Sequence, residues 1–468
     1  MHAKISRNGN ALYAAFIFVL FLPLFGEFFR RFIFHTYLVF LANDLIVLMF
    51  LVFLVLFKSN LHIVPRRYFF LLLWTASIYA LVTIFFGHGL LIVGALGIRD
   101  IFMPFMCGLC SAYFVTAFAD RALVGAMRTV NVWIILIACV AVLQLVLGQG
   151  HPINELPIFD KGTGIGDYAA GDVGLSFMFR PTSIFMHTGK FGQAIFLLVL
   201  FKWTSIIFGA HKLLRWPGWF MATIPFDLVA LIASGQRAAM LLLILFLIAA
   251  GPFMIVKVRR QRTATPATAK ARNMYLRIVL FSVLVLGVVG TLGALLEADV
   301  TELAWDRLLT VIDDVAVRGR ENVAIPMAEL IGEYLLSGSG AGYFNLGAEQ
   351  FGGARALETL STTGTAENSW LRLLAELGLP GLIITSILYG YVLWRAWRDI
   401  GRGDKSFYGQ QVFFVYWFIS MLFWANTHDT LSNSVVMYLG FGLSGFALVQ
   451  IKSQRFMIRP LGSVRKKC

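Results

Sequence analysis

Two charged residues stand where apolar stretches of this chain break off. Arg237 interrupts the run LIASGQRAAMLLL at 231–243, and Glu367 heads the run ENSWLRLLAELGLPG at 367–381. A guanidinium presents a planar fork of donors that suits phosphate oxygens, and an ionised carboxylate near a hydroxyl can act as a general base. The simpler interpretations are an arginine that snorkels to lipid headgroups and a carboxylate at a helix cap.

The second run also predicts a local structure. Asn368 or Ser369 can cap a helix that starts just after them. Glu367 would then stand at the mouth of that helix, where the helix dipole favours an anion. Gly378 and Pro380 weaken the same helix and are expected to bend it.

Further polar candidates lie in segments that we expect on the same side of the protein. Arg180 and His187 occur in MFRPTSIFMHTGKFGQ, Arg320 occurs in VRGREN, and His428 belongs to a His-Asp pair between two late apolar runs. The chain has no HExxH, clustered Cys/His or Asp-rich pattern, so the sequence predicts no metal site.

The elements that must position these residues are membrane helices. The chain has 468 residues, of which 59% are hydrophobic and 14% charged, with a mean hydropathy of +0.77. Globular domains are about 45–50% apolar, so we expect an all-α, polytopic integral membrane protein. Apolar runs of about 20 residues predict twelve spanning helices, at 11–27, 37–57, 68–86, 101–119, 129–147, 189–208, 217–233, 238–256, 276–296, 371–394, 411–428 and 432–451.

The formal net charge of +14 does not indicate nucleic-acid binding, because the basic residues follow this topology. With a cytoplasmic N-terminus, most of the 39 Lys and Arg residues fall in cytoplasmic segments, as in KVRRQR at 257–262. The outward segments hold most of the acids, which is the positive-inside pattern. Both termini are then cytoplasmic, and the basic loops would contact anionic headgroups of the lipid bilayer.

We expect one membrane domain, residues 1–468, with two outward loops. They are residues 148–188, rich in Gly and Asp, and the large loop 297–370, which carries most of the candidate motifs. The basic segment 257–275 is predicted to be a flexible cytoplasmic loop, and residues 120–128 a short one. The candidate residues therefore gather on the outward side.

Three charged residues fall within apolar runs, where charges are functional candidates by default, for example in transporters. Asp44 and Asp227 could equally be helix ends or members of internal pairs. The long side chain of Lys202 is expected to snorkel to the interface. A transporter or flippase of lipid-linked glycan is therefore the alternative class, although no inverted repeat is evident in the sequence.

Four stretches, taken in order, resemble the O-antigen ligase and Wzy-type polysaccharide polymerase superfamily over about residues 180–390. The ligase signature of that family is His-Asn, or a similar amide or hydroxyl residue, then nine residues and Gly-x-x-Gly. In this chain Glu367 and Asn368 precede nine residues and a Gly-x-x-Gly that starts at Gly378. The four stretches are SGQRAA at 234–239, GRENVA at 319–324, LLSGSGAGYF at 335–344 and ENSWLRLLAELGLPG at 367–381.

The resemblance implies a GT-C-like glycosyltransferase that uses no metal or other cofactor, at the periplasmic face of the bacterial inner membrane. Its donor would be an oligosaccharide on undecaprenyl diphosphate, and its acceptor a hydroxyl of a second lipid-linked unit. Partners could include a flippase and a chain-length regulator. We expect Glu367 and Arg237 to be catalytic, with Arg237 at the diphosphate, and the remaining substrate-binding candidates are Arg320, Arg180, Asn368, His187 and His428.

The usual histidine of the family is Glu367 in this chain. Either the glutamate serves as the base, or its position shapes the acceptor site and the base lies elsewhere, with His428 and His187 as candidates. The change favours a polymerase of O-antigen, capsule or exopolysaccharide repeat units. An O-antigen ligase that transfers glycan to lipid A core is the alternative within the family.

Overall fold

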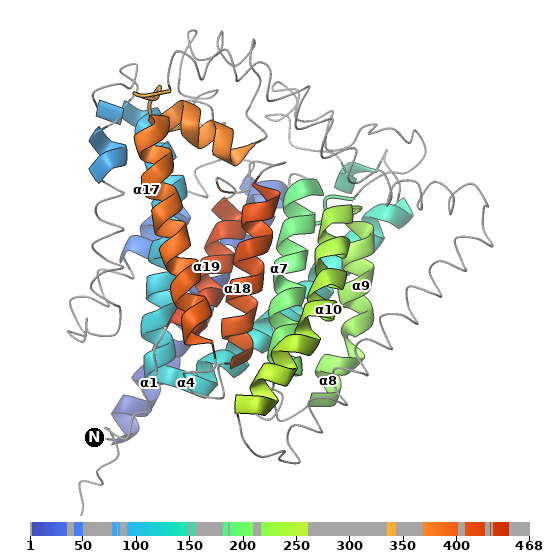
Figure 1. The fold of residues 1–468 in the computed structure, drawn as a ribbon. Coiled ribbons are helices and arrows are strands. Elements are labelled where there is room, and N and C mark those ends of the chain that lie inside the picture. The colour runs from blue at the N-terminus through green and yellow to red at the C-terminus, as the bar shows by residue number, and fades with distance from the viewer. Residues whose placement is uncertain are drawn as a thin grey trace, which may run out of the picture.

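The computed structural model of the chain is helical through most of the backbone that it describes. The described residues contain no strand, and their helices pack side by side as a bundle (Figure 1). The all-α fold expected from the sequence is therefore confirmed. The structure describes residues 2–34, 42–49, 77–81, 83–84, 91–147, 151–154, 181–185, 188–208, 217–260, 335–342, 368–400, 408–425, 431 and 434–448.

The labelled elements follow one another as helices and short helical turns. They are α1 (His2–Phe29), the π-helix η1 (Arg30–Phe34), α4 (Leu91–Leu147), the 3-10 turn η3 (Pro152–Asn154), α7 (Thr188–Ile207), α8 (Pro217–Ala222), α9 (Ile224–Ala233), α10 (Arg237–Arg260), α17 (Ser369–Asp399), α18 (Tyr408–Trp424) and α19 (Ser434–Leu448).

Five helical stretches in the described part of the chain are long and apolar enough to cross a membrane. They are Ala11–Ile33, Val93–Ala112, Asp120–Leu147, Gly189–Ile207 and Ser369–Arg398. Three shorter apolar helices accompany them, at Gly218–Ala233, Ala238–Ala250 and Val435–Gly445. The predicted span at 276–296 lies outside the described residues, so the number of twelve spans stays a prediction.

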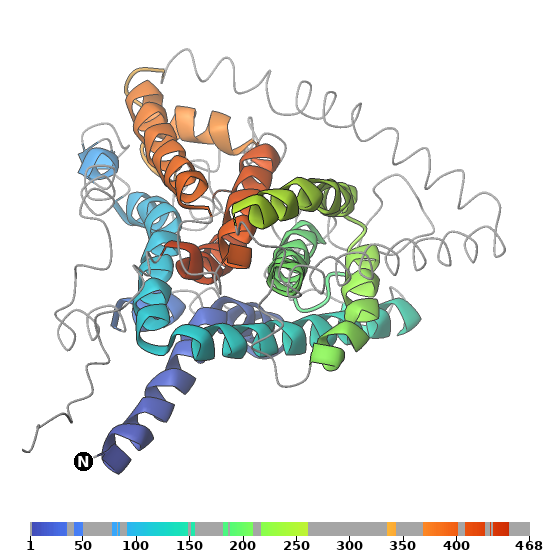
Figure 2. The same ribbon diagram turned by 60° about the horizontal axis from the view of Figure 1, so that its bottom comes forward.

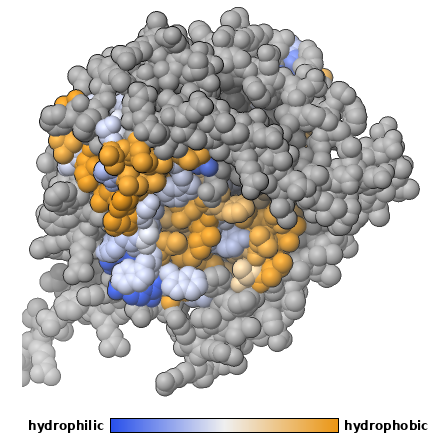
Figure 3. Space-filling view, turned by 45° about the horizontal axis from the view of Figure 1, so that its top comes forward, coloured by the Kyte–Doolittle hydropathy of each residue, from blue (hydrophilic) through white to orange (hydrophobic). Residues whose placement is uncertain are grey.

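The outside of the bundle is apolar. Large hydrophobic side chains on α10, α17 and α18 are exposed, among them Ile248, Ile387 and Phe423. Figure 3 shows a broad hydrophobic area on the described part of one face. Such a surface would be unfavourable in water and is satisfied by lipid. The chain is therefore an integral membrane protein.

Helix α7 forms the centre of the bundle. Its residues from Phe191 to Ile207 are all buried, and α4, α9, α10, α18 and α19 contact it, as Figure 2 shows for several of these neighbours. A helix that is apolar on every side requires such a central place. The end of the bundle at which α7 and α10 begin and α18 ends, the top in Figure 1, is called the upper end below.

Residues 120–128, predicted to be a short cytoplasmic loop, are helical and belong to α4. Their apolar side chains are buried against the bundle, including Leu123 and Met127. Figures 1 and 2 show that α4 changes direction sharply near the lower end of the bundle. The chain turns there by bending a helix whose apolar residues pack against the core, and the sequence pattern alone did not reveal this.

The predicted helix at 217–233 is interrupted at Thr223, which separates α8 from α9. Pro225 follows directly, and proline cannot donate the amide hydrogen bond of a continuous helix. The Thr223 hydroxyl instead takes part in a network with side chains of α4 and α7. The interruption therefore has a local cause in proline and a tertiary cause in a buried polar network.

Candidate active site at the upper end of the bundle

Arg237 is the first residue of α10, at the upper end. In the turn that precedes it, Gly235 has a φ of +61°, a left-handed conformation that favours glycine. The Gly235 amide donates to the Ile232 carbonyl at 3.0 Å, and the Gln236 amide donates to Ser234 Oγ at 3.3 Å. This tight turn explains why one apolar run stops and the next begins within the SGQRAA stretch.

The segment between Arg180 and α7 is a buried turn at 181–185. Its Ser183 has a φ of +54°, which is uncommon for a residue other than glycine. Gln144 of α4 holds the turn, because its Oε1 accepts from the Ser183 amide at 2.7 Å and its Nε2 donates to the Ser183 carbonyl at 3.2 Å. The chain next to Arg180 is thus fixed from the core.

Arg31 of η1 holds the same turn from another side. Its buried guanidinium donates to the Thr182 hydroxyl and the Phe185 carbonyl, and to the Ile153 carbonyl at 3.2 Å. These acceptors belong to two separate parts of the segment 148–188, which the sequence predicts to be an outward loop. One arginine therefore ties both parts to the top of α1, and π-helical turns such as η1 often occur at functional sites.

Asn368 caps α17, as the sequence predicts. Its Oδ1 accepts from the amides of Trp370 at 2.9 Å and Leu371 at 3.1 Å, two of the donors that a helix start leaves unsatisfied. The helix begins at Ser369. The backbone next to Glu367 is therefore fixed by a side-chain cap.

Ser369 connects the start of α17 to the segment that carries His428. The Ser369 amide donates to the Ala425 carbonyl at 2.9 Å, and Ser369 Oγ accepts from the Leu431 amide at 3.1 Å. His428 lies between Ala425 and Leu431, and Glu367 is two residues before Ser369. Because each residue spans at most about 3.6 Å of chain, both candidate bases are tethered to one point.

Helix α17 breaks at Gly378, which has a φ of +64° and a ψ of −176°. The bend expected from glycine and proline is confirmed. In Figure 1 the residues before the break run across the upper end, and those after it descend along the bundle. The break gives the ENSWLRLLA part of the motif an orientation along the rim of the bundle.

The glycine-rich segment 335–342 completes the hydrogen bonding of this broken helix. The Ala375 carbonyl accepts from the Ser339 amide at 2.9 Å, and the Glu376 carbonyl accepts from the Gly340 amide at 2.8 Å. In return, the Leu379 amide donates to the Leu335 carbonyl at 2.7 Å. Groups that a helix break leaves without helical partners are thus paired by the loop, and two of the four family-like stretches form one unit.

The same segment reaches α4. An ideal Cβ on Gly342, whose φ is +79°, would lie 2.5 Å from the Val93 carbonyl oxygen. A Cβ on Gly97 would lie 2.2 Å from the Gly342 amide nitrogen. Backbone packs directly on backbone at this contact, which explains the run of glycines in SGSGAG.

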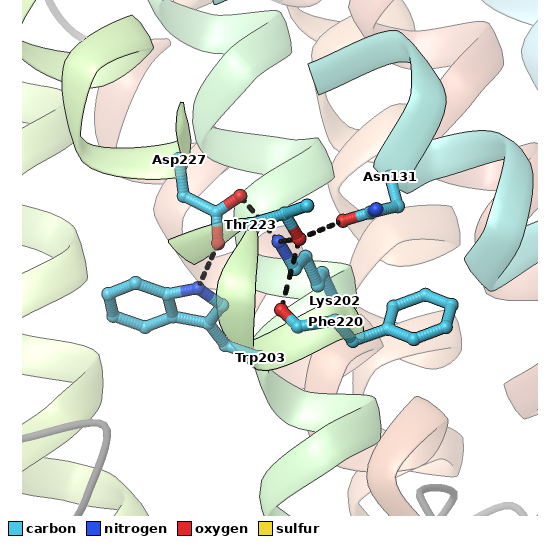
Figure 4. Close-up of polar contacts among 6 residues, drawn as sticks. All are labelled: Asn131, Lys202, Trp203, Phe220, Thr223 and Asp227. Atoms are coloured by element: carbon cyan, nitrogen blue, oxygen red, sulfur yellow. Dashed lines mark hydrogen bonds and ion pairs between the residues drawn. The ribbon is translucent and has the colours of Figure 1, made fainter. Parts of the chain in front are cut away.

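Lys202 does not snorkel, contrary to the sequence prediction. It is fully buried, and its Nζ donates to Asp227 Oδ1 at 2.7 Å and to Thr223 Oγ1 at 2.9 Å (Figure 4). Trp203 Nε1 donates to Asp227 Oδ2 at 2.7 Å, and Thr223 Oγ1 donates to Asn131 Oδ1 at 2.7 Å. A buried ammonium is tolerated here because every partner is supplied within the bundle.

Asp44 is also a member of an internal pair. Its carboxylate accepts from the Arg99 guanidinium and from the Tyr438 hydroxyl, and Arg99 Nη1 donates to Asp100 Oδ1 at 2.8 Å. Asp44 and Asp227 are therefore both members of internal ion pairs, and Asp227 also lies in the first turn of α9. The transporter alternative relied on these two acids, and both have a partner cation.

Sequence reasoning missed two buried charged groups near the candidate site. Arg372 Nε and Glu376 Oε1 lie 3.8 Å apart in the first part of α17, one helical turn from each other. Glu27, Arg30 and Arg31 are buried at the top of α1. These three charged residues directly follow the first apolar run of the sequence. A span that ended there in water would leave them exposed, whereas the structure buries them.

The structure describes two of the candidate site residues that were named from the sequence. Arg237 starts α10 and Asn368 caps α17, both at the upper end. The other candidates lie outside the described residues, and they are Glu367, Arg320, Arg180, His187 and His428. In the described ranges no group of three or more His, Cys, Asp or Glu residues could hold a metal ion.

Comparison with known proteins bears on this arrangement. Residues 219–386 match the family model Wzy_C, described as O-antigen ligase. The match includes the SGQRAA turn, the glycine-rich segment and the broken start of α17, and it confirms the resemblance inferred from the sequence. No curated protein matches the chain.

Proposed function

Because residues 219–386 match a family model described as O-antigen ligase, we propose that this integral membrane protein is a glycosyltransferase. In this proposal it polymerises undecaprenyl-diphosphate-linked oligosaccharide repeat units into O-antigen, capsule or exopolysaccharide. The reaction takes place at the periplasmic face of the inner membrane, and both chain termini are cytoplasmic. The observation that supports it most is that three of the four ordered stretches, at 234–239, 335–342 and 368–381, lie at the upper end.

The distribution of charge supports this orientation. Basic residues gather toward the lower end, where α10 and α17 end and α4 bends (Figure 1). They include Arg121, Arg128, Arg260, Arg395 and Arg398. The positive-inside rule places such an end in the cytoplasm, and the upper end then faces the periplasm.

The reaction is a displacement at the anomeric carbon of the donor sugar. Glu367 accepts the proton of the acceptor hydroxyl, and the hydroxyl oxygen forms the new glycosidic bond. The bond between the anomeric carbon and the diphosphate oxygen breaks, and undecaprenyl diphosphate leaves. Arg237 stabilises the negative charge of this leaving group, with Arg320 as a second cation, since fixed charges at a developing anion make the largest electrostatic contribution.

Other candidates complete the substrate site. Arg180 joins a turn fixed by Gln144 and Arg31, so a phosphate or sugar contact at this position is rigidly placed. His428 belongs to the short segment between Ala425 and Leu431, which both contact Ser369, so we assign it to orient the acceptor or share the proton. His187 directly precedes α7, whose N-terminus favours anions.

An O-antigen ligase is the second candidate, because the matched family model is described by that activity. Glu367 in place of the usual histidine favours the polymerase. Purified full-length protein can be supplied with one lipid-diphosphate oligosaccharide, alone or together with a lipid A core acceptor. A ladder of longer lipid-linked products supports the polymerase. Transfer to lipid A core without a ladder supports the ligase, and no transfer with either acceptor contradicts both.

A further inference from the structure

The top of α1 holds a carboxylate in an unusual environment. The Glu27 side chain is 0% exposed, and within the described part of the chain neither of its oxygens has a hydrogen-bond partner. Removing a carboxylate from water without hydrogen bonds is costly. Buried polar groups in folded proteins are nearly always hydrogen-bonded, so side-chain packing alone does not explain this carboxylate.

Lys190 is the nearest cation to this carboxylate. Its Nζ lies 3.8 Å from Glu27 Oε1, and its side chain is 23% exposed. The distance permits electrostatic attraction but is too long for a hydrogen bond. Lys190 therefore stands at the rim above a buried counter-charge, and no described residue takes any of its three donors.

Lys190 occupies the first turn of α7 (Thr188–Ile207). A helix N-terminus favours an anion and is unfavourable for a cation, so this lysine does not serve the stability of its own helix. An anion bound at this point would receive both the ammonium charge and the helix dipole. A buried Glu27 without a hydrogen bond from the described residues and a lysine at a helix N-terminus together point to a ligand.

Arg31 adds a second positive charge one turn after Glu27. The two groups interact electrostatically, but the Arg31 guanidinium bonds only to uncharged oxygens of the two loop segments among the described residues. One carboxylate thus faces two cations, and the cluster of Glu27, Arg31 and Lys190 is net positive. A positive, partly buried site suits a ligand with more than one negative charge.

This cluster adjoins the start of α10. A Cβ on Gly192 would lie 2.1 Å from Gln236 Cγ, and one on Gly189 would lie 3.6 Å from Gln236 Nε2. Gln236 therefore packs on the turn of α7 that carries Lys190. Arg237 is the next residue in the chain, so the first turn of α7 and the first residue of α10 are neighbours at the upper end.

We propose that Lys190 is a further diphosphate-binding residue, with Glu27 as the buried counter-charge that holds its ammonium at the rim when the site is empty. The assignment rests on the proposed function and adds Lys190 to the two arginines, Arg237 and Arg320, assigned to the same ligand. The ammonium exchanges its loose ion pair with Glu27 for charge-assisted hydrogen bonds to phosphate oxygens. Glu27 then opposes the ligand, since its charge has the same sign as the diphosphate.

A purely structural ion pair makes a different prediction from a phosphate site. If the pair only stabilises the fold, Lys190→Ala and Glu27→Gln should act in the same direction. If Lys190 binds diphosphate, the two substitutions should act in opposite directions on diphosphate affinity. Lys190→Ala removes an attractive charge, whereas Glu27→Gln removes a repulsive one.

The test measures binding of undecaprenyl diphosphate and undecaprenyl monophosphate to purified full-length protein, without turnover. We expect Lys190→Ala to weaken diphosphate binding by about tenfold or more, as for loss of one charge-assisted hydrogen bond, and monophosphate binding less. Lys190→Arg should stay within about threefold of the wild type, and Glu27→Gln should bind diphosphate more tightly than the wild type. Arg398→Ala, at the lower end, serves as the matched control and should bind like the wild type.

Two results would overturn the proposal. One is Lys190→Ala with wild-type diphosphate affinity, and the other is unchanged or weaker diphosphate binding by Glu27→Gln. Melting temperatures of all variants identify any that fail to fold, and the Glu27→Gln result decides the matter even if Lys190→Ala is lost. Wild-type protein that binds diphosphate through Lys190 but makes no product would contradict the proposed function and leave this site standing.

Discussion

Gly338 and Gly378 approach each other so closely that neither position can carry a side chain. An added Cβ on Gly338 would lie 2.7 Å from the Gly378 amide nitrogen, and one on Gly378 would lie 2.9 Å from the Gly338 amide nitrogen. Both residues have positive φ, +71° and +64°. The glycine-rich loop and the helix break are therefore one structural unit. Each needs a glycine because the backbone of the other lies where a side chain would be.

Gly378→Ala should destabilise the protein and reduce transfer activity. Alanine at φ +64° and ψ −176°, a conformation that is essentially restricted to glycine, costs about 1–3 kcal/mol, and its Cβ would also meet the Leu336 carbonyl oxygen at 2.7 Å. Thermal unfolding in detergent and product yield per folded protein measure the two effects. Gly390→Ala is the matched control in the same helix, because a Cβ there meets nothing within 4 Å. Equal behaviour of the two variants would contradict the docking of loop and helix.

Lys202→Met should lower the free energy of unfolding by about 3–5 kcal/mol, the usual cost of leaving one charge of a buried pair behind. Asp227 and Thr223 both lose a partner at 2.7 Å and 2.9 Å. Replacing both charges, in Lys202→Met with Asp227→Asn, should recover part of the loss, since the amide can still accept from Trp203 Nε1. A double variant less stable than Lys202→Met would argue against a coupled pair.

Much of this molecule could be predicted from the sequence, and the failures share a physical cause. The cap at Asn368, the break at Gly378 and the start of α10 beside Arg237 depend on local chemistry, so local patterns indicated them. The burial of Lys202 depends on Asp227 and Thr223 of other helices, and a single sequence does not show which helices meet. The pairing of SGSGAG with the helix break is likewise a tertiary contact, although the order of the motifs suggested a common site.

Glu367→His should restore the residue type that is usual in the family and shift the pH dependence of activity. A base works when deprotonated, so activity falls as the pH drops through its pKa. The reference pKa is about 4.3 for glutamate and about 6.5 for histidine, so the acidic limb of kcat/KM should move up by about two pH units. Glu367→Gln should lose activity.

An acidic limb that does not move in Glu367→His would place the base elsewhere. His428 is then the first residue to test, because the Ser369 contacts tether it to the same helix start. His428→Gln should in that case remove the limb. Activity that survives in both Glu367→Gln and His428→Gln would contradict both assignments.

The central claim is that the upper end of the bundle transfers glycan from a lipid diphosphate, with Arg237 at the leaving group. The most direct measurement is the length distribution of lipid-linked products made by purified wild-type and Arg237→Ala proteins with equal melting temperatures. We predict a ladder of products for the wild type, and a loss of about a hundredfold or more in rate for Arg237→Ala, as for removal of one group that stabilises a developing anion. A ladder of unchanged length and yield from Arg237→Ala would contradict the account.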